Sequence, residues 1–507
     1  HHLFQDALRF RLKQAHGELV PVLHQRASRW YEEQRLLDQA VEHALAGQDL
    51  SRAGDLIVNA FLPLWKQSAL GTLRRWIDEL PEVAFEQHPD LAFASAILLG
   101  YTGQLAQAET RLALAETQGQ AAPPPTHIAP DRATRHPGRI AMLKGILAAR
   151  QGAVADALSL AEETFHLLPA DDHVFRGGAF TVLGLAHLTS GALAEAQKAY
   201  EQAAEQARAV DHWFLLVGAL GRLAPIQVAL GRLHAAMASC QQMLDLPIVR
   251  RGGLPAAGFA HTGLAGVFYQ WDRLDRADEH AATAVGQGEA AAIVDLVYTA
   301  TLVQAQVKAA FGKRDDALAL IGRAHEVAAQ VGGPHMARRV RATGALIRLR
   351  FGEIEAAKHW ERTLDSVEAL DPLVVELEGL VQARLRLAEA QPEEALATLQ
   401  SLLPAAETAS RLSSVIEILL LQARALAASG QPGFAIERLE HALTLSEPEG
   451  YVRIFVDEGS SLIDLLRAVG RRESASQLRP YLERLLASCG GTEERDAVPG
   501  ELAHALI

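Results

Sequence analysis

Small residues recur along this chain at intervals of about forty positions, and this period restricts the possible fold more than any other feature. Glycine ends seven helix-forming stretches, and two further positions in the same phase carry Asp272 and Ala390. The intervals run from 38 to 41 residues, apart from one of 49. The phase positions are Gly103, Gly152, Gly191, Gly231, Asp272, Gly312, Gly352, Ala390 and Gly430. A repeat of this length is typical of stacked helical units.

Two further columns of small residues keep the same register. Alanine stands five residues after every phase position: Ala108, Ala157, Ala196, Ala236, Ala277, Ala317, Ala357, Ala395 and Ala435. Alanine or glycine stands seven residues before it: Ala96, Gly145, Gly184, Ala224, Ala265, Ala305, Ala345, Ala383 and Ala423. Two antiparallel helices approach closely only where small side chains face each other. The pattern therefore predicts nine helical hairpins, each with a tight turn at its phase position and an apolar face that stacking buries.

The fold class predicted from this pattern is all-α, a superhelical solenoid of about nine tetratricopeptide-like hairpins preceded by an irregular helical segment. The best single copy runs from Gly184 through Gly191 and Ala196 to Ala203, and its spacing of small residues resembles the tetratricopeptide repeat. That repeat is usually 34 residues long. The longer period here implies longer helices or longer joints between hairpins.

Composition and charge exclude several classes of function. The net charge of −13 provides no concentrated cationic face for phosphates, so direct nucleic-acid binding is not expected. Basic pairs such as Arg74-Arg75 and Arg338-Arg339 are interpreted as solvated helix faces. Two distant cysteines, Cys240 and Cys489, exclude a disulfide framework and favour a reducing compartment, most simply the cytoplasm. No membrane span is expected.

Catalytic signatures are also missing from the sequence. The twenty histidines form no HExxH pattern and no Cys/His cluster, and no GxSxG sequence occurs. Carboxylate pairs such as Asp171-Asp172 fall at loops or helix starts, where capping explains them. We therefore expect no catalytic residues, no metal site and no cofactor in this chain.

Motifs on either side of the repeats resemble a known family. The sequence reads HQRASRWY at 24–31, AVEHAL at 40–45, LRRWIDELP at 73–81 and GYVRIFVDEG at 450–459. Their order and spacing resemble the C-terminal portion of MalT-like regulators, which are large ATP-dependent transcriptional activators of the LuxR type. The resemblance extends from His1 to about Leu486.

The resemblance implies a signal-sensing and protein-interaction region. In that family this region receives an inducer, either a small molecule or a protein, and controls self-association and transcription activation. The family's GxxxxGK[ST] nucleotide-binding loop and its helix-turn-helix opening are not found in these 507 residues, so ATP is implied for the full-length family only. Two explanations remain open, a fragment and a natural product without the DNA-binding domain. A free-standing tetratricopeptide scaffold that binds a protein partner is the alternative function.

The predicted organisation has five parts. The resemblance assigns residues 1–20 to the end of a winged-helix-like segment. Residues 21–83 are predicted to be an irregular helical region, and residues 84–446 the repeat solenoid. Within it, Pro123-Pro124-Pro125 and two further prolines predict a surface loop over 119–138, which accounts for the interval of 49. Residues 447–487 are predicted to be C-terminal capping helices, and 488–507 a flexible tail.

Candidate ligand-contacting residues follow from the register, because in this repeat class the first helix of each hairpin faces inward. The candidates are Phe259, Thr262, Tyr269, Gln270, Gln306, Arg339, Arg350, Arg384 and Arg424. The first four combine aromatic and neutral hydrogen-bonding groups that suit a sugar or aromatic ligand; alternatively, the two rings fill gaps between hairpins. The arginines suit an anionic ligand or acidic peptide; alternatively, they pair with carboxylates on neighbouring helices.

Overall fold

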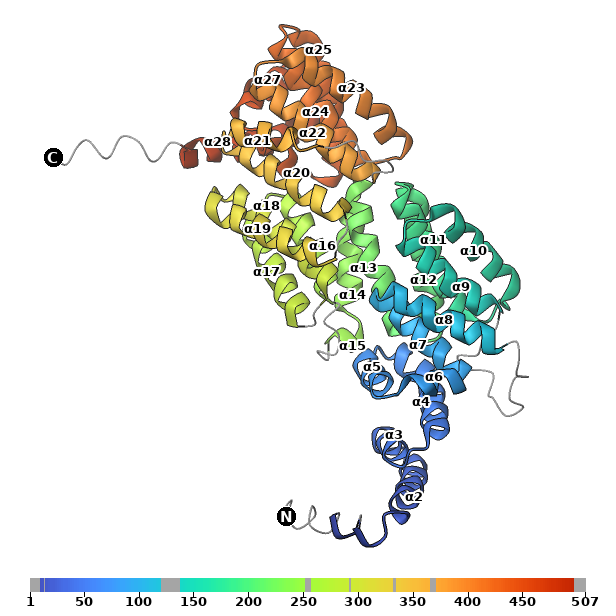
Figure 1. Ribbon diagram of the computed structural model, residues 1–507. Helices are drawn as coiled ribbons and strands as arrows, with labels where there is room; N and C mark the ends of the chain where they lie inside the picture. The colour runs from blue at the N-terminus through green and yellow to red at the C-terminus, as the bar shows by residue number, and fades with distance from the viewer. Residues whose placement is uncertain are drawn as a thin grey trace, which may run out of the picture. The chain divides into compact units, whose positions relative to one another are not determined.

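The computed structural model describes residues 10–12, 14–119, 137–250, 257–290, 293–331, 334–364 and 371–496. Throughout these ranges the regular elements are helices, and no strand occurs in them (Figure 1). The predicted all-α class is therefore confirmed. The chain divides into two compact units, His1–Ala186 with Gln202–Leu216, and His187–Glu201 with Val217–Ile507. Each unit is described by itself.

In the described part of unit 1, irregular helices precede the first hairpins. They include α2 (Leu19–Glu33), α3 (Leu37–Ala46), α4 (Leu50–Lys66), α5 (Leu70–Asp78) and α6 (Glu82–Gln87). The hairpins are α7 (Pro89–Thr102) with α8 (Leu105–Gly119) and α9 (Pro137–Arg150) with α10 (Val154–Leu167). Unit 1 also holds most of α11 (His173–Thr189), the end of α12 (Leu193–Ala209) and the start of α13 (Trp213–Ala229). Helix α7 packs on α4 as well as on α8, so the irregular helices and the array share a core.

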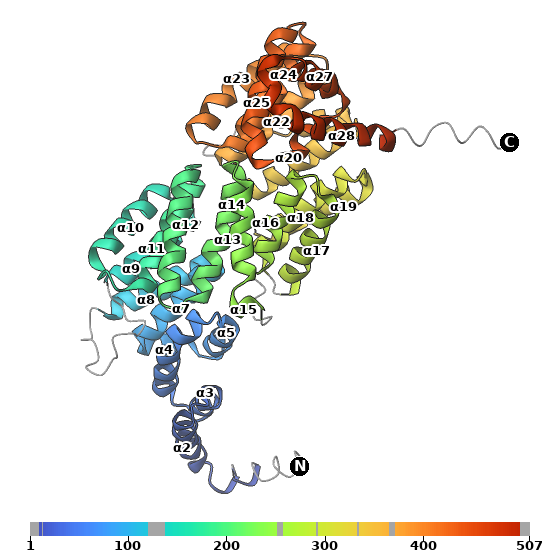
Figure 2. The ribbon, with the colours of Figure 1, turned by 180° about the vertical axis from the view of Figure 1, so that it is seen from behind.

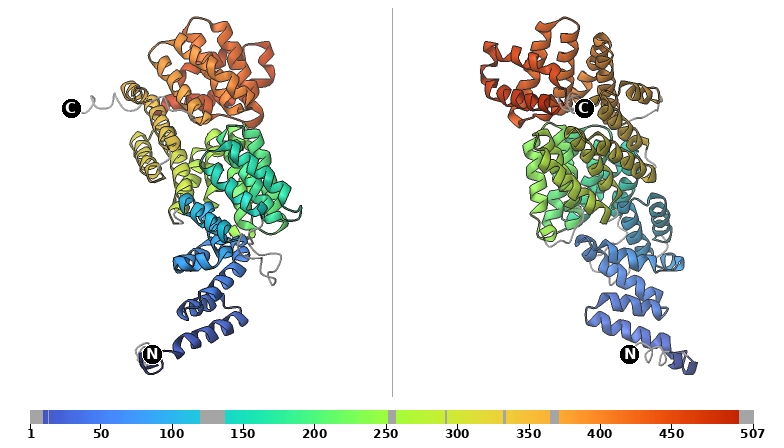
Figure 3. Two further views of the ribbon diagram at one scale, coloured as in Figure 1. Left: turned by 45° about the vertical axis from the view of Figure 1, so that its right-hand side comes forward. Right: turned by 90° about the vertical axis from the view of Figure 1, so that its left-hand side faces the viewer.

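Unit 2 holds the remaining hairpins and the C-terminal helices. After α13 come α14 (Leu233–Leu244), α15 (Pro247–Arg250), α16 (Gly258–Gln270), α17 (Leu274–Ala290), α18 (Val294–Ala310), α19 (Arg314–Val331), α20 (Pro334–Arg350), α21 (Ile354–Glu361), α22 (Pro372–Ala388), α23 (Pro392–Thr408), α24 (Leu412–Ala428) and α25 (Pro432–Ser446). They are followed by η2 (Glu447–Glu449), α26 (Arg453–Val456), η3 (Ser460–Leu462), α27 (Ile463–Gly470), η4 (Glu473–Leu478) and α28 (Arg479–Asp496). Hairpins α16–α17 and α18–α19 lie side by side, and so do α22–α23 and α24–α25 (Figure 2). The orange and red helices of the C-terminal part lie together in both further views (Figure 3).

The predicted turns occur at all nine phase positions. Their φ angles are positive throughout, from 73° to 86° at the glycines and 56° and 57° at Asp272 and Ala390. In each turn, the amide after the phase position donates to the carbonyl five residues earlier, as Gln104 does to Leu99 (2.9 Å). This bond belongs to the Schellman ending of a helix, which requires a left-handed residue. The backbone therefore keeps the same turn even where glycine is replaced.

Both small-residue columns lie in the helix interfaces. All nine alanines that follow the turns are 0% exposed, and the nine residues that precede them are buried as well. The longer period comes from longer helices: α22 and α23 each have 17 residues, and three-residue joints (389–391 and 409–411) follow them.

The described residues include only parts of the predicted proline-rich loop and of the predicted C-terminal tail. Helix α8 ends at Gly119 and α9 begins at Pro137, so most of the predicted proline-rich loop, 120–136, lies outside the described residues. Helix α28 continues to Asp496 because Leu485 and Cys489 are buried, so residues 488–496 of the predicted tail are helical; residues 497–507 lie outside the described residues. Cys240 and Cys489 are both buried, and no disulfide joins them. No helix among the described residues is long and apolar enough to cross a membrane.

One interpretation of the basic pairs is wrong. Arg338 does not lie on a solvated face: its side chain is 7% exposed and makes two 2.8 Å bonds to the Glu378 carboxylate. Helices α20 and α22 pack against each other and enclose this pair. Arg74, in contrast, pairs with Asp78 on the surface, as expected.

Candidate functional site

The first helices of consecutive hairpins form one continuous layer in unit 2. Helix α16 contacts α18, α18 contacts α20, α20 contacts α22, and α22 contacts α24. We call residues 450–459 the acidic strap; they contact residues near the C-terminal ends of α16, α20, α22 and α24. The strap begins and ends at left-handed glycines, Gly450 (φ 69°) and Gly459 (φ 75°).

Apolar side chains and backbone bonds hold the acidic strap in place. Tyr451 and Phe455 are 0% exposed. The Val452 amide donates to the Gln270 carbonyl at the end of α16 (2.8 Å), and the Tyr481 hydroxyl of α28 donates to the Tyr451 carbonyl. Just before the strap, the Glu449 carbonyl accepts a bond from the Trp271 indole (2.9 Å). These contacts fix the strap against the turn between α16 and α17.

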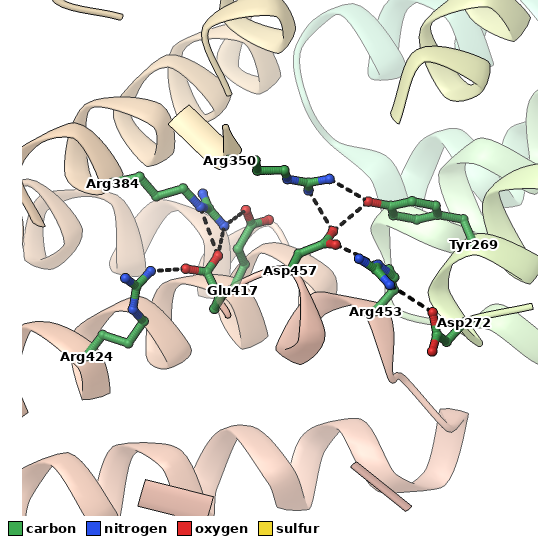
Figure 4. Close-up of polar contacts among 9 residues, drawn as sticks. Tyr269, Asp272, Arg350, Arg384, Glu417, Arg424, Arg453 and Asp457 are labelled. Carbon is green, nitrogen blue, oxygen red and sulfur yellow. Dashed lines mark hydrogen bonds and ion pairs between the residues drawn. The ribbon is translucent and has the colours of Figure 1, made fainter. Parts of the chain in front are cut away.

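Asp457 of the strap lies between two arginines and a tyrosine (Figure 4). Its Oδ2 accepts bonds from Arg350 Nη2 (2.6 Å) and from the Tyr269 hydroxyl (2.5 Å), and Arg350 Nη1 also donates to that hydroxyl (2.9 Å). Its Oδ1 accepts from Arg453 Nε (2.6 Å), and Arg453 in turn pairs with Asp272 (2.9 Å). One carboxylate therefore links the strap to the ends of α16 and α20.

Glu458 makes the corresponding contacts with the next first helices. Its Oε1 accepts from Arg384 of α22 through Nε (2.9 Å) and Nη2 (2.6 Å), and its Oε2 accepts from Arg424 of α24. Arg384 also pairs with Glu417 of α24 at 2.6 Å (Figure 4). Two consecutive carboxylates of the strap therefore contact the arginines of three first helices.

The two strap carboxylates are buried, and burial strengthens their interactions with the arginines. The side chains of Asp457 and Glu458 are 8% and 2% exposed. Burial by itself raises a carboxyl pKa, yet the neighbouring arginines outweigh it and hold the pKa of both groups below its ordinary value. Burial raises the pKa of Tyr269 to about 12, so its hydroxyl stays protonated and donates. Both strap carboxylates are therefore ionised at neutral pH.

The structure brings together four of the nine candidate residues. Tyr269, Arg350, Arg384 and Arg424 all contact the strap carboxylates, and all lie in the last two turns of first helices. Gln270 joins them through its backbone carbonyl. The arginines pair with the strap, and Arg384 also pairs with Glu417 of a neighbouring helix. Binding of an external anionic ligand by these arginines stays a prediction.

The other four candidates lie elsewhere on the first helices. Phe259 is half-buried and packs against an apolar cluster that includes Leu296. The Thr262 hydroxyl donates to the Gly258 carbonyl of its own helix (3.0 Å). Gln306 is half-buried and Arg339 is exposed. Within the described ranges, none of these side chains has a hydrogen bond or ion pair to the strap.

The strap's own charged residues were not predicted as site residues. Asp457 and Glu458, together with Arg453, belong to the segment GYVRIFVDEG at 450–459. Their sequence signal is an Arg–Asp pair four residues apart that surrounds the apolar Ile454, Phe455 and Val456. Charges placed within such an apolar segment indicate burial with a partner. Among the described residues, no group of three or more His, Cys, Asp or Glu side chains is arranged to hold a metal ion.

The stacked hairpins and their small-residue register define a tetratricopeptide-type repeat protein. The MalT-like TPR region matches residues 138–472, and the chain belongs to this family.

Two curated relatives show how much of a longer protein the chain corresponds to. The HTH-type transcriptional regulator MalT of Klebsiella pneumoniae is 24% identical over 498 residues, which cover 95% of this chain and 52% of that protein. The regulator of the same name from Yersinia pestis is 25% identical over 496 residues, which cover 95% and 53%. The chain thus spans about half the length of the curated relatives it matches.

A solved structure supports the fold. A Rap protein complexed with Competence and Sporulation Factor superposes with a TM-score of 0.55 at 12% identity, over 72% of this chain and 99% of that one. At this identity the likeness concerns the fold alone.

Proposed function

We propose that this chain is the signal-sensing and protein-interaction region of a MalT-like LuxR-family transcriptional regulator. An effector, either a small molecule or a regulatory protein, binds on the first-helix face of unit 2, and its binding controls self-association and transcription activation. The main support for the proposal is that Asp457 and Glu458 form ion pairs with arginines of three first helices. The family membership supplies the regulatory context.

The acidic strap gives this face two alternative states. With the strap docked, Arg350, Arg384 and Arg424 already have carboxylate partners and offer little to an external anion. With the strap released, the same three cations face solvent together. An effector shifts the balance between these states by as much as its affinity for them differs. An anionic or acidic effector therefore favours release, whereas one that contacts the docked strap favours closure.

The proposal assigns binding rather than catalysis to this region, in the cytoplasm, with no cofactor of its own. ATP and DNA binding belong to the remainder of a full-length regulator. Support for a bound partner comes from the Rap structure, whose description names a complex with Competence and Sporulation Factor.

A thermal-shift screen of sugars, amino acids, dicarboxylates and aromatic metabolites tests the proposal, followed by sedimentation velocity with each compound that changes the Tm. The proposal expects a compound that changes both the Tm and the sedimentation coefficient. Its half-saturating concentration should change several-fold in Arg384→Gln and Glu458→Gln. The control is Asp464→Asn, whose carboxylate is 94% exposed on α27.

Two outcomes count against the proposal. An active compound whose half-saturating concentration is the same in both variants does not act through the strap or its arginines. A screen in which no compound changes the Tm contradicts a small effector and favours the scaffold that binds a protein partner.

A further inference from the structure

A hollow of about 540 Å³ lies beside the base of the acidic strap in unit 2. Four segments line it: the start of α14, the turn between α16 and α17, the residues from η2 to Val452, and the first turns of α28. Its volume is in the range of small-molecule sites in proteins. None of the candidate residues predicted from the sequence lines it.

Hydrogen bonds fix the walls of this hollow. The Trp271 indole donates to the Glu449 carbonyl (2.9 Å), and the His234 amide donates to the Glu449 carboxylate (2.9 Å). The rings of His234 and Trp271 lie 5.3 Å apart. Tyr481, another lining residue, is 4% exposed and donates its hydroxyl to the Tyr451 carbonyl. A ligand would therefore meet a preformed wall with little ordering cost.

Two guanidinium groups line the hollow, and each lies over an aromatic ring. Arg273 is 5.7 Å from the Trp271 ring centre, and Arg484 is 5.2 Å from the Tyr481 ring centre. In the part of the chain that the structure describes, neither arginine has a carboxylate within ion-pair distance. The hollow therefore presents planar donors that match a carboxylate and have no acceptor side chain of their own.

The remaining charges in the lining restrict the ligand further. Glu447 and Glu449 also line the hollow, the first exposed and the second bonded to the His234 amide. Two negative charges so close to the arginines disfavour a phosphate dianion more than a singly charged carboxylate, because the repulsion grows with the ligand's charge. The half-buried Trp271 ring offers a flat surface to an aromatic body.

We propose that this hollow binds an aromatic monocarboxylate, with its carboxylate between Arg273 and Arg484 and its ring against Trp271. The site is separate from the first-helix face and does not depend on the effector proposed above. It also stabilises the docked strap, because Glu449 and Val452 line the hollow and lead directly into Arg453, Asp457 and Glu458. A ligand in the hollow therefore reduces release of the strap from the arginines.

Isothermal titration of the full chain with phenylacetate and benzoate tests this site, with phenylacetamide as the uncharged counterpart. We expect saturable binding of the carboxylates and no detectable binding of the amide. Arg273→Gln and Arg484→Gln should each weaken binding about tenfold, because each removes a charge-assisted bond. Arg276→Gln is the matched control: it lies on α17, contacts Phe268 and does not line the hollow.

Hydrogen exchange of residues 451–458 provides a second readout. Phenylacetate should slow exchange there in the parent chain and in Arg276→Gln, whereas Arg484→Gln should need about ten times more phenylacetate for the same slowing. The proposal is overturned if neither carboxylate binds saturably, or if the amide binds as well as the acid. Affinity in both arginine variants equal to that of the parent chain also overturns it. The comparison of acid and amide uses the unaltered chain, so a variant that fails to fold does not remove the test.

Discussion

Units 1 and 2 use the same hairpin register but fill the space between hairpins differently. Unit 1 has a continuous apolar cluster from Ala40 to Ala186 that includes the buried rings of Phe61, Trp65 and Phe93. Unit 2 has apolar clusters of its own, and it also buries ion pairs in which both side chains are at most 13% exposed: Arg338–Glu378, Arg411–Glu376, Arg384–Glu458 and Arg453–Asp457. Among the described residues of unit 1, Arg139–Asp172 alone meets the same limit, at 11% and 10%.

Apolar contacts and buried ion pairs suit different roles: the first hold stacked hairpins together, and the second can control release of the strap. Apolar contacts are non-directional and tolerate small shifts, whereas a buried ion pair is favourable only while both partners are in place. An array held by the first kind of contact is stable over a range of geometries. The acidic strap depends on the second kind, so its docking is expected to be close to all-or-none, as a signal-responsive element requires.

The largest expected effect is loss of the Glu458 charge. In Glu458→Gln, Arg384 and Arg424 lose their shared carboxylate while they remain largely buried. We expect the free energy of opening of the strap and the end of unit 2 to fall by roughly 3 kcal/mol. Native-state hydrogen exchange of residues 451–485 measures it, and unit 1 amides should be unaffected.

A surface pair provides the control for this variant. Asp464 and Arg467 are 94% and 58% exposed, so Asp464→Asn should change stability by less than about 0.5 kcal/mol. If the two variants behave alike, the strap carboxylates are solvated in solution and the contrast between the units disappears.

The sequence predicted the hairpins because their cause is local. A small residue at each crossing and a left-handed turn between helices are properties of a single repeat, and each repeat carries them again. Asp272 and Ala390 were placed in phase without glycine, and both adopt the positive φ of the other seven turns. The inward-facing positions were counted from the same register, and Tyr269, Arg350, Arg384 and Arg424 do lie together at one end of the first helices.

The partners of those residues were not predictable in the same way. Asp457 lies 107 residues from Arg350, and Tyr269 is 188 residues from Asp457. Which residues meet over such separations depends on the small rotation between consecutive hairpins, summed over several repeats, and no local pattern specifies that sum. The hollow beside Trp271 depends on the same long-range placement.

The next largest expected effect is a loss of stability of unit 1 in acid. Burial, followed by the Lys66 charge, lowers the pKa of His212 in unit 1 to about 3, and its ring lies edge-on to Trp65 at 4.7 Å. Because the unfolded chain takes up this proton near 6.5, unit 1 loses stability as pH falls below that value, by about 2 kcal/mol between pH 7 and pH 5.

The strap responds to acid in a different range. The pKa values of Asp457 and Glu458 are lowered, so their contribution is complete above the ordinary values of 3.8 and 4.5 and is lost only below them. Urea unfolding followed by circular dichroism at pH 7 and pH 5 checks both statements. His212→Gln should remove the part of this pH dependence that comes from unit 1. An unchanged dependence would assign it to other groups, such as His261 and His280 of unit 2, whose pKa values burial also lowers.

The smallest expected effects concern the turns. The turns at Gly103 and Gly152 in unit 1 have glycine, whereas Ala390 in unit 2 holds a φ of 57° with a β-carbon. Ala390→Gly should gain roughly 0.5–1 kcal/mol by relief of that conformation. Gly152→Ala should lose about 1 kcal/mol, since an added β-carbon meets no atom within 4 Å and only the backbone is strained. Tm values that move in the same direction would contradict this account.

The most direct test of the docked strap is a double-mutant cycle between Arg384 and Glu458. The free energies of opening of the parent chain, Arg384→Gln, Glu458→Gln and the double variant come from hydrogen exchange of residues 451–485. If Arg384 and Glu458 form their ion pair in solution, we expect a coupling energy of at least about 1.5 kcal/mol. The reason is that the second substitution removes a charge that the first left unpaired. Additive effects, with a coupling below about 0.5 kcal/mol, would contradict it and leave the arginines of α22 and α24 without their internal ligand.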